Sequence, residues 1–186
     1  MAKAKKKIAS HARGRQAGRP RQDAIAILKA DHRQVEQWFE QFEKTRSAPR
    51  KETLARQICQ ALQVHTQIES EVFYPAFLEA TGDKDIHHEA EVEHNGAKKL
   101  IAEIESSGPD DDYFDAKVTV LSEMIKHHVR EEEKSGGMFA EARKSDMDLK
   151  QLGERLAARK AELESGNGKA GGAWLRDAER QSHSVR

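Results

Sequence analysis

Two short segments of the sequence carry a histidine and a glutamate at the same spacing. His65 precedes Glu69 in the run H-T-Q-I-E, and His128 precedes Glu132 in the run H-V-R-E-E. Residues four apart lie on one face of an α-helix, so each pair can present two donor groups in the same direction. Imidazole and carboxylate together suit iron, manganese or zinc. The two pairs therefore predict a metal site.

The chain also carries donor residues inside apolar stripes. Four segments show apolar residues at alternating intervals of three and four, which is the pattern of a buried helix face. Histidine and glutamate are the only polar residues on these stripes, at His32, His65, Glu69, His94, His128 and Glu132. An unpaired, ionised carboxylate in such a position costs several kcal/mol. A shared metal site explains all six; the alternative is a buried polar network that satisfies itself without metal.

The six residues are also predicted to lie at one height of an antiparallel bundle. Two residues on antiparallel neighbours lie level when they are equally far from the turn that joins them. His32 and His65 meet this condition for the first turn. Glu69 and His94 meet it for the second turn, and His94 and His128 for the third. Three turns thus agree on one layer.

The chain repeats its donor pattern. The interval from His32 to His65 is 33 residues, and the interval from His94 to His128 is 34. Each half consists of a segment with one His followed by a segment with His-x-x-x-Glu. This pseudo-two-fold arrangement suits two metals bridged by two carboxylates, as in di-iron carboxylate bundles.

The elements that position these donors are bounded by capping and breaker residues. Helices are predicted over residues 23–45, 50–79, 84–106 and 113–134, with Pro75 expected to kink the second. Short connections between long helices predict an all-α, up-down-up-down four-helix bundle. We assign residues 23–144 to this bundle, including a short helix over 138–144. An extra C-terminal helix is expected within 145–164, followed by a flexible tail over 165–186.

Charge is unevenly distributed along the chain. Residues 1–21 carry eight Lys or Arg and no acid, so the remainder has a net charge of −8. Residues 1–22 are predicted to be a disordered basic arm. Such an arm is either a solubilising terminus or a weak contact for nucleic acid or an anionic surface. No apolar stretch approaches the ~20 residues of a membrane span, and the single Cys59 fits a reducing cytoplasm.

The order H…HxxxE…H…HxxxE resembles the hemerythrin-like family, also called HHE cation-binding domains. The resemblance covers roughly residues 23–144. Its local matches are Asp31-His32, the run H-T-Q-I-E-S-E-V-F-Y-P from His65 to Pro75, Glu93-His94, and the run H-H-V-R-E-E-E from His127 to Glu133. The resemblance implies two iron ions with an oxo or hydroxo bridge, four terminal histidines, and bridging Glu69 and Glu132.

The sequence departs from the respiratory hemerythrins in two places. Ala90 and Lys98 stand four residues to either side of His94, so the second histidine of the third helix is missing. The fourth helix offers Glu132 in place of an aspartate five residues after its histidine. Fewer protein donors leave more positions for water, an oxo group or substrate, which favours chemistry or sensing over oxygen storage. Glu91 is a candidate for a further ligand.

Three functions remain open from the sequence. The resemblance implies oxygen, peroxide or nitric oxide as the small oxidant, handled by a redox protein that is catalase-like or otherwise oxidant-consuming. The second function is an iron- or oxygen-responsive binding module without turnover. The third is an iron protein tethered to nucleic acid by the basic arm. Among neighbouring residues, Glu131 and Glu133 are expected in solvent and Tyr74 in the core.

Overall fold

The structure is a computed structural model that describes residues 22–166, and every regular element in this range is helical. The predicted basic arm lies outside the described residues except for Gln22, as does the predicted tail beyond Gly166. No helix within residues 22–166 has the length and apolar character needed to cross a membrane.

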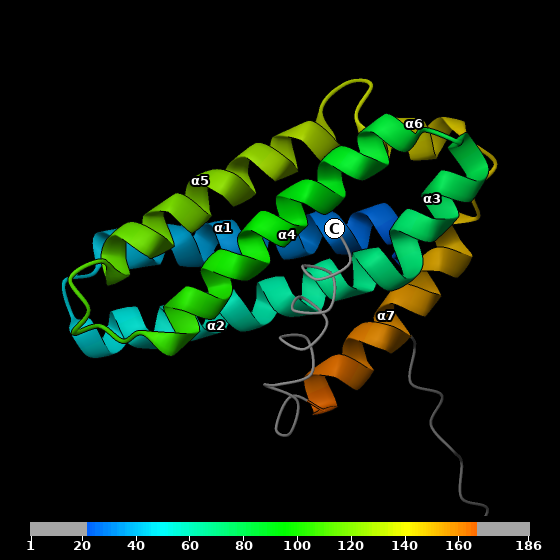
Figure 1. Ribbon diagram of the computed structural model, residues 1–186. Coiled ribbons are helices and arrows are strands. Elements are labelled where there is room, and N and C mark those ends of the chain that lie inside the picture. The colour runs from blue at the N-terminus through cyan, green and yellow to red at the C-terminus, as the bar shows by residue number, and fades with distance from the viewer. Residues whose placement is uncertain (1–21, 167–186) are drawn as a thin grey trace, which may run out of the picture.

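Four long helices form the bundle, and each runs antiparallel to its neighbours (Figure 1). They are α1 (Ala24–Lys44), α2 (Ala48–Ile68), α4 (Lys84–Ser106) and α5 (Phe114–Glu133). Aspartate side chains cap two of them: Asp23 accepts a hydrogen bond from the Ala26 amide at 2.8 Å, and Asp83 from the Ile86 amide at 3.1 Å. The predicted fold class, an all-α four-helix bundle with a further C-terminal helix, is confirmed.

The predicted second helix is divided into three segments rather than simply kinked. A π-helical turn, η1 (Glu69–Phe73), separates α2 from α3 (Tyr74–Thr81). Within it, the Tyr74 amide donates to the Glu69 carbonyl, five residues back. Pro75 lacks an amide hydrogen and its ring crowds the preceding turn, so the helix widens there. In a π-turn residues five apart share a face, which places Tyr74 on the same face as Glu69.

Two further helices close one end of the bundle. A tight turn with Gly136 at φ +77° leads to α6 (Met138–Lys144), and α7 (Leu149–Gly166) follows. A side chain at Gly137 would collide with the Glu131 carbonyl oxygen, at 2.2 Å from its Cβ. The last helix begins at Leu149, inside the predicted range 145–164, and ends two residues beyond that range at Gly166. The Asp148 side chain accepts from the Gln151 amide at 2.9 Å. This helix lies along α1, α2 and η1.

The apolar core consists of two clusters. One fills the bundle end that contains Phe39, Phe42 and Phe114. The other fills the end that α3, α6 and α7 close, around Phe73 and Phe77. The six predicted donors lie between the two clusters along their helices, so a layer of polar groups crosses an otherwise apolar interior. This layer is where the chemistry of the chain is concentrated.

Candidate metal centre

All six predicted donor side chains point into one buried layer. None is more than 4% exposed: His32, His65, Glu69, His94, His128 and Glu132. Helix α1 contributes the first, α2 and η1 the next two, α4 the fourth and α5 the last two. The structure therefore brings together every residue that the stripe pattern and the level rule selected.

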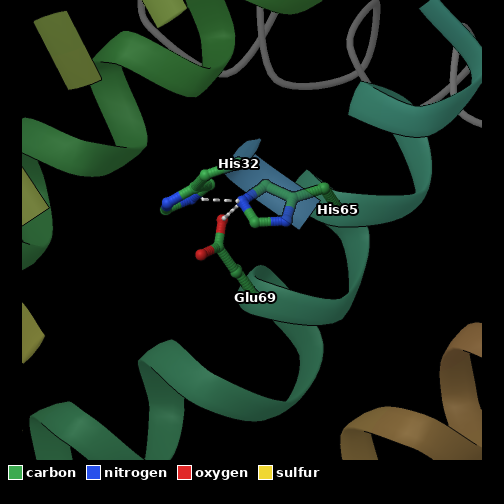
Figure 2. A group of neighbouring side chains, drawn as sticks. All are labelled: His32, His65 and Glu69. Carbon is green, nitrogen blue, oxygen red and sulfur yellow. Dashed lines mark hydrogen bonds and ion pairs between the residues drawn. The ribbon is translucent and has the colours of Figure 1, made fainter. Parts of the chain in front are cut away.

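The four histidines form two pairs. In the first half, His32 Nε2 lies 3.1 Å from His65 Nε2 (Figure 2). In the second half, His94 Nε2 lies 3.2 Å from His128 Nε2. Two nitrogens bound at right angles to one metal, each at ~2.1 Å, are ~3.0 Å apart. Each pair therefore has the spacing of two ligands to one ion.

Glu69 lies between the two histidine pairs. Its Oε2 is 3.2 Å from His65 Nε2 and 3.3 Å from His94 Nε2. One of these nitrogens belongs to the first pair and the other to the second. The carboxylate thus occupies the position of a bridge between two sites.

Glu132 has the complementary position. Its Oε2 is 3.5 Å from His32 Nε2 and 3.6 Å from His128 Nε2, again one nitrogen from each pair. Each of the two carboxylates therefore lies close to one histidine nitrogen of the first pair and one of the second. This arrangement has the pseudo-two-fold symmetry predicted from the repeated spacing.

Buried carboxylate oxygens in this layer lack hydrogen-bond partners. Both oxygens of Glu69 and Oε2 of Glu132 accept no hydrogen bond, although each Oε2 lies within 3.6 Å of histidine nitrogens. A buried polar group left unsatisfied costs ~1–3 kcal/mol, and more if charged. Cations between the histidine pairs would satisfy all three oxygens at once. The residues present therefore fit a metal centre better than a polar network closed on itself.

The sequence of the chain also matches a known protein family. The model of the hemerythrin HHE cation binding domain matches residues 23–135, which include all six donors. The chain belongs to this family. Binding of a metal cation is the property that the family description states and that these side chains can provide.

Two known proteins are similar to this chain. A hemerythrin HHE cation binding domain-containing protein from Mycobacterium kansasii has the same fold, with a TM-score of 0.66 over 84% of this chain and 98% of that one, at 20% identity. A DNA nickase from Nostoc sp. is 27% identical over 152 residues. The alignment covers 80% of this chain but only 42% of the nickase.

Three carboxylates outside the layer hold the histidine rings of the HHE centre. Glu133 Oε1 accepts from His32 Nδ1 at 2.9 Å, and Glu93 Oε2 accepts from His128 Nδ1 at 2.7 Å. These bonds place the proton on Nδ1 and leave the Nε2 lone pair free for a metal. Asp31 approaches the third ring, with its Oδ2 3.6 Å from Nδ1 of His65.

Sequence reasoning did not assign these carboxylates to the HHE centre, and for Glu133 it was wrong. The Glu133 side chain is only 15% exposed, and it also pairs with Lys29 at 3.0 Å and with Arg33 at 2.6 Å. A signal was present in the sequence, because Asp31 and Glu93 each directly precede a donor histidine and Glu133 directly follows a donor glutamate.

Tyr74 reaches the HHE centre from the π-turn. Its hydroxyl donates to Glu132 Oε1 at 3.2 Å and lies 3.1 Å from His94 Nε2. Its ring stacks on the His94 ring, with centroids 5.2 Å apart and planes at 26°. The residue is buried as expected, but its polar end contacts two of the donors.

The surroundings shift the pKa values of the donors in the metal-free protein. Burial lowers the pKa of His94 to about 4. Burial also opposes the charge of His65, but the Glu69 and Asp31 carboxylates outweigh it and raise the pKa of His65 to about 10. Burial and the charge of Glu69 raise the pKa of Glu132. Two carboxylates this close repel each other when both are ionised, and cations between them would remove that penalty.

Other candidates lie outside the HHE centre. The Glu91 side chain is 51% exposed, and its nearest ionic partner is His87 Nε2 at 3.9 Å. His127 is 50% exposed and pairs with Glu93 Oε1 at 3.1 Å. Neither belongs to the buried group of six. The buried Cys59 is also remote, since it lies in the apolar cluster around Phe39 and Phe42.

Proposed function

We propose that the HHE centre holds two iron ions and reacts with a small oxidant such as oxygen, peroxide or nitric oxide. His32 and His65 would be terminal ligands of one ion, and His94 and His128 of the other. Glu69 and Glu132 would bridge them, together with an oxo or hydroxo group. The position of each carboxylate between a histidine of the first pair and one of the second carries this proposal.

Iron in such a site would supply the change of oxidation state that neither imidazole nor carboxylate undergoes. The protein groups supply orientation, because Glu133 and Glu93 fix two of the rings through Nδ1. Tyr74 donates a hydrogen bond to Glu132 beside the second histidine pair. An acceptor that gains negative charge during the reaction would be stabilised by such a donor.

The space beside the donors favours a small reactant. The cavity bounded by the four histidines, Asp31, Thr66 and the apolar Val35, Leu62, Ile125 and Val129 has a volume of about 10 Å³. A single water needs ~10–15 Å³ of such volume. The space therefore holds at most one molecule the size of water, and even a diatomic or peroxide reactant requires small movements of the surrounding side chains.

Metal analysis and an absorption spectrum test the first part of the proposal. Two irons per chain and near-ultraviolet charge-transfer bands are expected. His65→Ala and Glu69→Ala should lose both features, whereas His88→Ala, at an exposed histidine of α4, should retain them. A protein that contains no transition metal and takes up none would overturn the proposal.

Turnover separates an enzyme from a sensor. Peroxide-driven oxygen evolution that disappears in His65→Ala would assign a catalase-like activity. Absence of turnover with two irons bound, combined with a large change in protease sensitivity on iron removal, would assign a responsive binding module.

Contact with DNA is a second candidate, favoured by the likeness to the Nostoc nickase and by the eight basic residues within positions 1–21. If such residues bind DNA, the logarithm of the binding constant should fall linearly with the logarithm of the salt concentration. Retention on double-stranded DNA should fall when residues 1–21 are deleted. Retention that is unchanged by the deletion would dismiss the arm as a tether.

A further inference from the structure

A surface pocket reaches the second half of the HHE centre. Its volume is about 130 Å³, and it lies between α4, the end of α5 and the turn into α6. Glu89, Glu93 and Glu131 line its outer part, whereas the buried donors His128 and Glu132 line its inner part. At ~30 Å³ per water, the pocket has room for several solvent molecules. It therefore extends from the surface to two of the six donors.

The two halves differ at the residue that opens this pocket. Ala90 stands four residues before His94 and lines the pocket. Leu28 stands four residues before His32 and is wholly buried. The grooves on the side of α7 reach Asp31 but are lined by none of the six donors. A small side chain on α4 thus leaves space where a leucine on α1 fills it.

The charge of the pocket selects for cations. Four glutamates and one lysine line it. The lysine, Lys134, is paired with Glu131, and Glu93 is held between His127 and His128. A cleft with an excess of carboxylates concentrates cations and repels anions. The Glu132 carboxylate on the inner wall is 98% buried, and its Oε2 accepts no hydrogen bond and lies 3.6 Å from His128 Nε2. A cation that enters therefore finds ligands there.

We propose that this pocket is the route by which hydrated divalent cations reach the His94–His128 position, with the exposed Glu89 carboxylate as their first contact. The proposal rests on the metal centre proposed above and adds the path by which it is filled. Water molecules leave the cation one by one as Glu89, Glu93 and then Glu132 replace them. The first histidine pair is loaded from the same side, across the bridging carboxylates.

The rate of metal uptake by the metal-free, full-length protein tests the route. Co²⁺ is a suitable probe because its absorption in a His/carboxylate site can be followed in a rapid-mixing experiment. Ala90→Leu, which copies the equivalent Leu28, should slow uptake at least tenfold and leave the final number of ions unchanged. Ala61→Leu, beside the separate groove lined by Trp38 and Gln57, is the matched control and should load at the wild-type rate.

A charge reversal tests the same route without filling the interior. Glu89→Lys should slow uptake several-fold at low ionic strength, and added salt should reduce the difference. Glu103→Lys, at an exposed position on the same helix, should have no such effect. Uptake at the wild-type rate in Glu89→Lys, or equal slowing in Glu103→Lys, would overturn the route while leaving the metal centre intact. Failure of the wild-type protein to bind Co²⁺ would instead count against the centre itself.

Discussion

The two halves of the HHE centre have the same donors but different surroundings. Asp31 precedes His32 and faces His65, and Glu93 precedes His94 and faces His128, so one carboxylate of each half occupies an equivalent place. The similarity ends beyond the donor glutamates. The two halves therefore share their donor residues but not the residues around them, so the two metal positions proposed above have unequal surroundings.

The first difference concerns the ring support of the leading histidine in each half. His32 donates to Glu133 through Nδ1. The residue equivalent to Glu133 in the other half is Ser70, and Nδ1 of His94 has no hydrogen-bond partner. A carboxylate on Nδ1 makes the opposite nitrogen a stronger ligand. Of the two leading histidines, His32 should therefore be the stronger ligand, while in the second pair the carboxylate support falls to His128, which donates to Glu93.

The second difference is the hydroxyl beside His94. Tyr74 stands five residues after Glu69, and the equivalent residue five after Glu132 is Gly137. The π-turn brings Tyr74 over the centre, whereas the chain at Gly137 turns away into α6. Of the two metal positions proposed above, the second therefore has both a hydrogen-bond donor, Tyr74, and an open pocket beside it. We expect exogenous reactants at the second position.

The largest effect is expected from removal of either bridging carboxylate. Glu69→Ala and Glu132→Ala should each reduce iron from two ions per chain to nearly none, because each carboxylate serves both positions. Elemental analysis of the purified variants measures this directly. Retention of one full iron in either variant would show that the missing carboxylate served only one half.

Intermediate effects are expected from the outer carboxylates. Glu133→Gln and Glu93→Gln should weaken metal affinity ~10–100-fold, since each replaces the charged acceptor of a ligand ring by a neutral one. Asp31→Asn should have a smaller effect, because its oxygen lies 3.6 Å from the His65 ring. Competition with a chelator measures the affinities, and Ser70→Ala is the control at the position equivalent to Glu133. If Ser70→Ala weakened metal affinity as much as Glu133→Gln, the inference that His32 is better supported than His94 would be wrong.

A smaller effect is expected from the tyrosine. Tyr74→Phe removes the bond to Glu132 but keeps the stacked ring, so the free energy of unfolding should fall by ~1 kcal/mol. The spectrum of the metal-loaded protein should also change, because the hydroxyl contacts donors of the second half. Tyr113→Phe, at a tyrosine that is 70% exposed, should alter neither. An unchanged spectrum in Tyr74→Phe would show that the Tyr74 hydroxyl does not influence the metal centre.

The smallest effect on the metal centre is expected at Cys59, whose equivalent in the other half is the buried Ser122. Burial raises the pKa of the Cys59 thiol from 9.0 to about 12. The folded chain therefore holds this proton more tightly than the unfolded chain, and stability should decline as pH rises from 9 towards 12. Alkylation at pH 9 should be roughly five-hundredfold slower than in denaturant, because that is the ratio of the two thiolate fractions. Cys59→Ser should reduce the loss of stability between pH 9 and 12 and leave the iron content unchanged. Rapid alkylation of Cys59 in the folded protein would show that the thiol is not buried.

The donors could be predicted from sequence because each depends on helical periodicity. A polar residue that interrupts an apolar stripe can be recognised in the sequence itself. Residues at one height of the bundle can be recognised as well, because they are equally far from the turn that joins their helices. The structure brings all six together, while their action as iron ligands stays a prediction. Neighbours that depend on where a helix ends were not predictable. Glu133 reaches His32 only because α5 ends beside α1.

Tyr74 shows a second limit of sequence reasoning. Pro75 located the irregularity correctly, but a bend and a widened turn direct the following side chains differently. Only the widened turn places the Tyr74 hydroxyl beside Glu132. Leu152 and Leu156 are four residues apart and are the kind of apolar pair that the sequence shows, but the sequence does not show that their helix packs along α1 and η1.

The placement of α6 and α7 means that the HHE centre is completed by residues beyond position 135, where the family match ends. Phe139 lies flat against His32, with ring planes at 11°. From α7, Lys160 holds Asp31 and Arg159 holds Glu71 in the π-turn at 2.6 Å. A force that pulled α7 from the bundle would therefore release two supports of the metal-binding layer together. A molecule that bound the outer face of α7 and displaced this helix would therefore loosen Asp31 and Glu71 together.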